Sequence, residues 1–187
     1  MKKKDEKGNV GTHGSCVLWQ QRKSPRAVFH NYSGGDYFVT ICTRGKEHYF
    51  GKIIDGNMQY TSIGKYCEQQ ITEISGHYPY ASVSLFVVMP NHVNAIIHID
   101  GTIPDSGKMP DNNRTHEPCV PTERTALSIV IGGFKRAVTM FARRNDIDFG
   151  WQSRYHDHII RGNHDGNMIS EYIINNVARW ASDCFCN

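Results

Sequence analysis

The sequence predicts an α+β protein with a ferredoxin-like, four-stranded antiparallel sheet, helices on one face and an added C-terminal helix. Four apolar runs rich in β-branched residues alternate with segments of helical periodicity, in the order strand, helix, strand, strand, helix, strand, helix. A chain of 187 residues is long enough to fill one core of this kind. Because this fold serves many activities, function has to be argued from particular residues.

The first half of the chain supplies one strand, a hairpin arm and one helix. Residues 37–43 are β-branched and aromatic, as is typical of a strand, and residues 52–60 predict a short hairpin. Thr61 can cap a helix whose apolar residues recur at helical spacing until Gly76. This helix would then lead into the two central strands.

The second half supplies a helix, a strand and a last helix. Thr125 can begin a helix with its apolar residues on one side, and Trp151 to Arg161 predicts the final strand. Either Asn167 or Ser170 would then open a last helix that runs to about Cys184. The sheet face left free by the other helices can receive this last helix.

Two segments lack periodicity. Residues 1–34 predict an irregular N-terminal arm, so the single domain would occupy residues 35–187. Within it, residues at about 100–123 are rich in Gly, Pro, Asp and Asn and predict a flexible insertion. The insertion could lie over a nucleic-acid face or be a simple loop.

Composition bounds the class of protein. The net charge of +3 is only mildly basic, so global charge alone does not argue for nucleic acid. No apolar run is long enough to cross a bilayer, and the six cysteines fit no compact disulfide framework. We therefore expect a reduced, cytoplasmic monomer or homodimer with no membrane partner.

The most informative stretch joins the two central strands. Residues 83–89 and 92–99 are apolar runs separated by a tight turn at Pro90 and Asn91. Side chains alternate along a strand, so His92 and Asn94 would project side by side from one face. Such a pair suits a metal site or a phosphate clamp, although the solvated end of a strand is the simpler alternative.

Met89-Pro90-Asn91-His92-Val93 resembles the signature of the single-tyrosine transposases of the HUH class, in particular the REP-associated tyrosine transposases of bacteria. That family usually has His, a hydrophobic residue and a second His, whereas this chain has Asn94 at the second position. The resemblance extends over most of the chain in the family's order, through residues 37–43, 132–135, 151–152, 156–161 and 172–176.

The resemblance implies that Tyr172 is the catalytic nucleophile. Asn176 follows four residues later, so both side chains would share one face of a helix. If that helix crosses the sheet over His92 and Asn94, three ligands (His92, Asn94 and Asn176) would converge on one ion. Amide oxygens and a single imidazole would suit Mg²⁺ or Mn²⁺ better than Zn²⁺. Tyr155, beside two histidines, is the rival nucleophile, and a packing role is the ordinary alternative for Tyr172.

Clustered cations would contact the phosphates of single-stranded or hairpin DNA, while His158 could contact a base or add a metal ligand. The candidate DNA-binding residues are Arg44, Lys135, Arg136, Arg143, Arg144, His158 and Arg161. Solvated surface is the alternative for any single pair of cations.

Two functions from different classes follow. The first is a metal-dependent transposase-like enzyme that cleaves and rejoins DNA through a 5′-phosphotyrosine intermediate, as the resemblance implies. The second is a non-catalytic protein that binds DNA hairpins and has lost cleavage through Asn94. An RNA-binding ferredoxin-like domain is a weaker third alternative, because His92 and Asn94 occupy the place where base-stacking aromatics would be needed.

Overall fold

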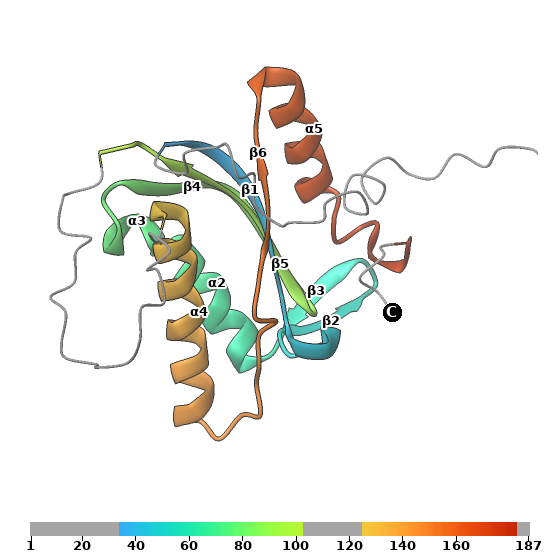
Figure 1. The fold of residues 1–187 in the computed structure, drawn as a ribbon. Coiled ribbons are helices and arrows are strands. Elements are labelled where there is room, and N and C mark those ends of the chain that lie inside the picture. Colours follow the sequence, from blue (N-terminus) through green and yellow to red (C-terminus); the bar gives the residue numbers. More distant parts are fainter. Residues whose placement is uncertain (1–33, 103–124, 183–187) are drawn as a thin grey trace, which may run out of the picture.

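The computed structural model describes residues 34–102 and 125–182 and has the predicted fold class. A four-stranded antiparallel sheet has the order β4-β5-β1-β6 (Figure 1). This is the ferredoxin-like order, because the hairpin of β4 and β5 lies on one side of β1 and β6 lies on the other. The strands are β1 (Gly35–Cys42), β4 (Ala81–Met89), β5 (His92–Ile99) and β6 (His156–Ile159).

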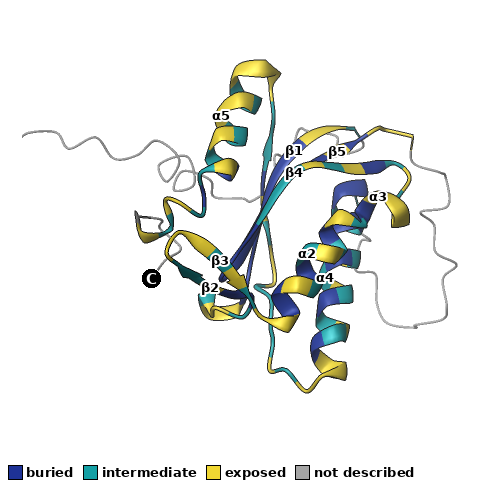
Figure 2. Ribbon diagram, turned by 180° about the vertical axis from the view of Figure 1, so that it is seen from behind, coloured by how far each residue is buried: buried dark blue, intermediate teal, exposed yellow. Residues whose placement is uncertain are grey.

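Helices cover both faces of this sheet. On one face lie α2 and α4, and on the other lies α5, as Figures 1 and 2 show from opposite sides. The helices are α2 (Ser62–Thr72), α3 (Ile74–His77), α4 (Ala126–Arg144) and α5 (Gly162–Ile174), with short 3-10 turns η1 (Arg44–Lys46) and η3 (Trp180–Ser182). A separate hairpin pairs β2 (Gly51–Ile54) with β3 (Asn57–Tyr60), as the sequence predicted.

The main core lies between the sheet and the α2–α4 layer. From β5 it takes Val93, Ala95 and Ile97, the alternate residues that the strand pattern predicts, and all three are buried. The two helices also contact one another, with the rings of Tyr66 and Phe141 stacked at 4.2 Å between centroids. This face therefore holds the larger apolar core, with Asp157 buried beside Tyr37 as a charged neighbour.

Local sequence explains where the two long helices begin. The Thr61 side chain accepts a hydrogen bond from Gly64 N at 3.2 Å, and Thr125 accepts one from Ser128 N at 3.3 Å. Gly64 is required by space, because a Cβ there would collide with the carbonyl oxygen of Phe50. The predicted N-terminus of α4 is thus confirmed, and so is that of α2.

A smaller apolar cluster lies on the opposite face, under α5. Its buried members are Phe38, Ile96 and Ile173. Strand β4 contributes Leu85 and Val87, because a shift of register between Val83 and Leu85 turns these odd-numbered residues to the α5 face, whereas Val83 packs in the main core. This cluster docks α5 on the sheet.

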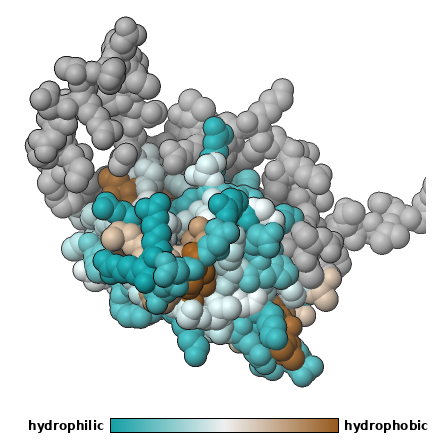
Figure 3. Space-filling view, turned by 90° about the horizontal axis from the view of Figure 1, so that it is seen from below, coloured by the Kyte–Doolittle hydropathy of each residue, from teal (hydrophilic) through white to brown (hydrophobic). Residues whose placement is uncertain are grey.

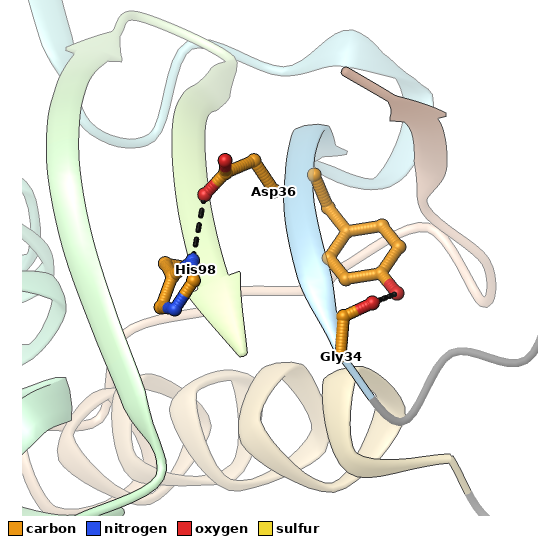
Figure 4. A network of polar contacts seen from close by, with 4 residues as sticks. Gly34, Asp36 and His98 are labelled. Atoms are coloured by element: carbon orange, nitrogen blue, oxygen red, sulfur yellow. Dashed lines mark hydrogen bonds and ion pairs between the residues drawn. The ribbon is translucent and has the colours of Figure 1, made fainter. Parts of the chain in front are cut away.

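At one end of the sheet, polar contacts tie down the start of β1 (Figure 4). Asp36 and His98 form a cross-strand pair, with Oδ1 and Nδ1 2.8 Å apart. The Tyr37 hydroxyl donates to the Gly34 carbonyl at 2.7 Å. Burial, with Asp157 and Asp36 nearby, raises the pKa of Tyr37 to about 12, so this phenol remains a donor at neutral pH.

The predicted bounds of three elements were wrong. The first predicted helix ends at Thr72 rather than Gly76, and α3 follows as a separate turn. The last strand is confined to β6, although Trp151 still bridges to Thr43. The last helix runs from Gly162 to Ile174 rather than from Asn167 or Ser170 to about Cys184. At its start the Asp165 carboxylate accepts the Arg161 backbone N–H at 3.0 Å, in a stretch that otherwise resembles a turn.

Several expectations fall on other parts of the chain. Almost all of the arm at 1–34, most of the insertion at about 100–123, and Cys184 lie outside the described residues. Cys42 and Cys67 are buried, as expected of small apolar side chains. No helix among residues 34–102 and 125–182 has the length and apolar character needed to span a membrane.

Candidate functional site

Three rows of side chains cross the face of the sheet under α5. Strand β5 presents His92, Asn94 and Ile96 on this face, as the alternation predicts. On β1, Thr40 lies opposite Asn94 and Phe38 lies opposite Ile96. The rows therefore change from apolar at Ile96 to polar at Asn94 and His92.

A buried chain of hydrogen bonds runs through the middle row. The Thr40 hydroxyl donates to Asn94 Oδ1 at 2.6 Å, and Asn94 Nδ2 donates to Asn176 Oδ1 at 3.1 Å. Each of these side chains is at most 1% exposed. Both ends of the Asn94 amide thus have protein partners, which satisfies the rule that buried polar groups are paired.

Asn176 reaches this row from beyond the last helix. Helix α5 ends at Ile174, and Asn176 lies in the turn that follows, with its N–H donating to the Ile173 carbonyl at 3.2 Å. The expected placement of Tyr172 and Asn176 on one continuous helix was therefore wrong. The structure still brings Asn176 to Asn94, because the turns after Ile174 keep the chain against the sheet.

Tyr172 lies on the same face of the sheet as His92. Its ring is partly buried and meets Phe38 edge to face, with 6.0 Å between centroids and 87° between planes. Tyr155, the rival nucleophile, packs against the main core on the opposite face. Of the two tyrosines, Tyr172 is the one that shares a layer with the polar rows.

His92 is fully buried at the end of β5. Its Nδ1 lies 2.9 Å from Asn91 Oδ1, while Asn91 Nδ2 donates to the Lys46 carbonyl at 3.1 Å. The Trp180 ring lies over the imidazole at 6.1 Å between centroids. Asn91 therefore connects His92 to the η1 turn, and Trp180 covers it.

The chemistry of these donors is a poor fit for a divalent ion. None of His92, Asn94, Asn176 and Thr40 is a carboxylate, and Mg²⁺ and Mn²⁺ bind chiefly through carboxylates. Both amide oxygens already accept hydrogen bonds from protein groups. Within the described residues, no three His, Cys, Asp or Glu side chains are grouped to hold a metal ion. A buried ion here would lack compensating negative charge.

The cations predicted on α4 lie in the helix layer that covers the other face. Arg143 and Arg144 are exposed in its last turn, where they also favour the helix dipole. Seen from below (Figure 3), the end of the molecule toward which α4 runs is mostly hydrophilic, with small separate brown regions. Arg136 is also exposed on α4. None of these residues lies in the layer that contains Tyr172.

Lys135 and Arg44 have partners of their own. Lys135 Nζ donates to the Gln152 carbonyl at 2.6 Å and lies 5.8 Å from the Trp151 ring centroid. Burial lowers the pKa of Lys135 below its ordinary value. Arg44 pairs with Asp148 at 3.1 Å and is largely exposed. Lys135 thus has a structural role between α4 and the segment before β6.

His158 and Arg161 lie where β6 meets α5. His158 Nε2 lies 2.8 Å from Asp165 Oδ2, which also accepts the Arg161 backbone N–H at 3.0 Å. The Asp165 carboxylate therefore fastens the start of α5 to β6. The Arg161 side chain remains exposed beside it.

Reasoning from the sequence missed Thr40 and Trp180. Thr40 is found only through the pairing of β1 with β5. Trp180 carried a signal in the sequence, because it follows Asn176 at the same interval of four that separates Asn176 from Tyr172.

A protein of Haemophilus influenzae (strain ATCC 51907 / DSM 11121 / KW20 / Rd), described as an uncharacterized protein, is 39% identical over 180 residues, which is 95% of this chain and 96% of that one. The chain matches no family model. Among solved structures, a REP-associated tyrosine transposase bound to a REP hairpin is similar, with a TM-score of 0.48 and 17% identity over 82% of this chain and 72% of that chain. A "putative transposase" from Deinococcus radiodurans R1 has a TM-score of 0.43 and 13% identity over 82% of this chain and 97% of that chain.

Proposed function

The chain belongs to the same family as that Haemophilus influenzae protein, and we propose that it is a transposase-like protein that binds single-stranded or hairpin DNA without cleaving it. The observation that carries this proposal is the Asn94 amide, which is bonded on one side to Thr40 and on the other to Asn176. At the position where the HUH signature has its second histidine, this chain has a buried structural link.

The link opposes metal-dependent cleavage. An ion held by Asn94 and Asn176 would have to displace or share oxygens that already accept hydrogen bonds. Breaking such bonds inside a protein leaves buried donors unpaired, at a cost of about 1–3 kcal/mol each. Since the remaining donors bring no negative charge, little would offset that cost.

Support for DNA comes from the resemblance and from the groups available on the α5 face. The segments that resemble the transposase signature meet on the α5 face, where Asn94 of β5 bonds to Asn176 and Tyr172 of α5 packs nearby. Exposed His156, Arg161 and Arg179 lie on the elements that border it. Cations bind phosphates, and aromatic rings stack on unpaired bases, so these groups suit a single strand.

DNA cleavage is the second candidate, favoured by Tyr172 and His92 sharing one face. In that reaction the Tyr172 oxygen would attack a phosphorus, the bond to the 3′ oxygen would break, and a 5′-phosphotyrosine and a free 3′-hydroxyl would result. It would require Mg²⁺ or Mn²⁺, which polarises the phosphate when bound. His92, Asn94 and Asn176 are the residues proposed to hold the ion in this case.

One experiment distinguishes the two candidate functions, binding without cleavage and cleavage. Labelled DNA hairpins with single-stranded flanks are incubated with the protein and Mn²⁺, then run on native and denaturing gels. We expect a shifted band on the native gel and no covalent band on the denaturing gel. Failure to bind any hairpin would overturn the proposal, and a covalent band that Tyr172→Phe abolishes and Tyr155→Phe retains would establish cleavage instead.

Asn94→His tests whether the second ligand alone is missing. If cleavage is merely weakened, this variant should bind Mn²⁺ more tightly and give more covalent product, because imidazole restores the usual ligand; ligand-sphere changes shift metal affinity on the order of 10–100-fold. Titration calorimetry measures the metal and the denaturing gel measures the product. Tight Mn²⁺ binding without product would favour the non-cleaving protein.

A further inference from the structure

From the last turn of α5 onward, three side chains at intervals of four residues follow the rows of the sheet. Tyr172 contacts Phe38 in the apolar row, Asn176 bonds to Asn94 in the next row, and Trp180 lies over His92 in the last. The interval persists beyond the end of α5 because backbone bonds such as Arg179 N to Asn175 O, 3.0 Å, keep the turns helix-like. Trp180 is therefore placed by the same register that places Asn176.

Trp180 lies between a buried histidine, His92, and an exposed one, His48. Its ring centroid is 6.1 Å from that of His92, with 31° between planes, and 5.6 Å from that of His48, with 63° between planes. His92 is buried, whereas His48 is exposed and Trp180 is partly exposed. The rings of His92, Trp180 and His48 form an aromatic cluster, here called the aromatic step. Its His92 end is buried and its His48 end is exposed to solvent.

The loop that carries His48 is fixed to the sheet. The Thr43 hydroxyl lies 2.9 Å from the Asn91 carbonyl and 2.8 Å from the Glu47 carbonyl. Asn91 Nδ2 donates to the Lys46 carbonyl, and Phe50 N donates to the Pro90 carbonyl at 3.0 Å. These bonds hold the loop against the turn before His92. The step is thus preorganised, which lowers the entropy lost when a ligand binds.

We propose that Trp180 and His48 form a stacking subsite for one unpaired nucleobase of the bound DNA strand. This inference rests on the proposed function and names a position within it. A flat, partly exposed indole suits any base, because every base has a π-face. Arg179 precedes Trp180 and is exposed, so a cation lies beside the step for the adjoining phosphate.

The test pairs a change in the protein with a change in the DNA. A hairpin with single-stranded flanks is prepared with an abasic site at each unpaired position in turn, and its affinity is measured for the full chain and for Trp180→Leu. For the unchanged protein, we expect one abasic position to weaken binding roughly 5- to 150-fold, the range for one stacked base. In Trp180→Leu, the intact hairpin should already bind that much more weakly, and the same abasic site should have no further effect.

Two more variants control for folding. His48→Ala changes an exposed side chain and should reproduce part of the loss at the same abasic position. Trp180→Phe keeps a ring and should retain most of the binding. An abasic scan without a sensitive position, or equal sensitivity in Trp180→Leu, would overturn the subsite while hairpin binding stands. If the unchanged protein binds no intact hairpin, the proposed function fails and the subsite fails with it.

Discussion

The two faces of the sheet differ in composition and in how many side chains are buried on them. The face under α2 and α4 contains most of the buried hydrophobic side chains of the described residues, and the buried Asp157 lies on this face too. Among the described residues, the cluster under α5 has three buried apolar members and borders the polar Asn94 and His92. A ferredoxin-like fold thus uses one face for stability and leaves the other for specific polar contacts.

This difference shows how little apolar contact is needed to hold the α5 segment. Ile173 docks the helix, and the hydrogen bond from Asn94 to Asn176 fixes the turns beyond it. Met168 and Ile174 remain exposed, at 60% and 68%. The α5 layer should therefore open more readily than the α4 layer, since its few contacts contribute less to stability.

The largest expected effect comes from truncating one core residue on each face. Phe134→Ala should destabilise the protein by about 3–5 kcal/mol, because it leaves a cavity in the main core. Ile173→Ala should cost about 2 kcal/mol, at the low end of its class, because α5 can settle over the small cluster. Urea denaturation gives both free energies of unfolding. Equal losses would show that the two faces are equally important for stability.

Removing the central amide gives the next effect. Asn94→Ala should cost about 1–3 kcal/mol for each buried group that it leaves unpaired, on Thr40 and Asn176. The matched control is Asn163→Ala, an exposed asparagine on α5, which should change stability by less than about 0.5 kcal/mol. Additive effects of Asn94→Ala and Asn176→Ala in a double-mutant cycle would contradict the link.

The salt dependence of DNA binding tests which face of the sheet binds the DNA. Neutralising Arg161 and Arg179, near α5, should reduce the log–log salt slope by roughly 0.7 per lost phosphate contact. Neutralising Arg143 and Arg144, on α4, should leave it unchanged. The reverse result would place the DNA over α4, as the clustering of cations in the sequence had predicted.

The smallest expected effect is on the stability of the protein at low pH. Burial raises the pKa of Asp165, but the Arg161 backbone N–H and His158 outweigh it, so the net pKa lies below the ordinary 3.8. A depressed pKa adds stability above the ordinary value, and this stability is lost as pH falls through the folded value. Asp165→Asn should therefore lower the melting temperature at pH 6 and make little difference near pH 2. A constant difference across this range would rule out the carboxylate charge as the cause.

The sequence by itself determined the fold class, most elements and the two sides of β5. Alternation places His92 and Asn94 on one face and Val93 and Ala95 on the other, because successive side chains of a strand must point apart. Threonine caps likewise marked the beginnings of α2 and α4. These features depend on neighbours a few positions away, so they can be read locally.

Only the tertiary structure decided what the polar residues do. The bonds of Asn94 to Thr40 and Asn176 span 54 and 82 positions of the chain, and no local pattern reveals that both ends of the amide are occupied. The pairing of Lys135 with Gln152 and the placement of Trp180 over His92 depend on packing in the same way. Packing and pairing across the sheet fix these contacts, because they are set by which surfaces meet.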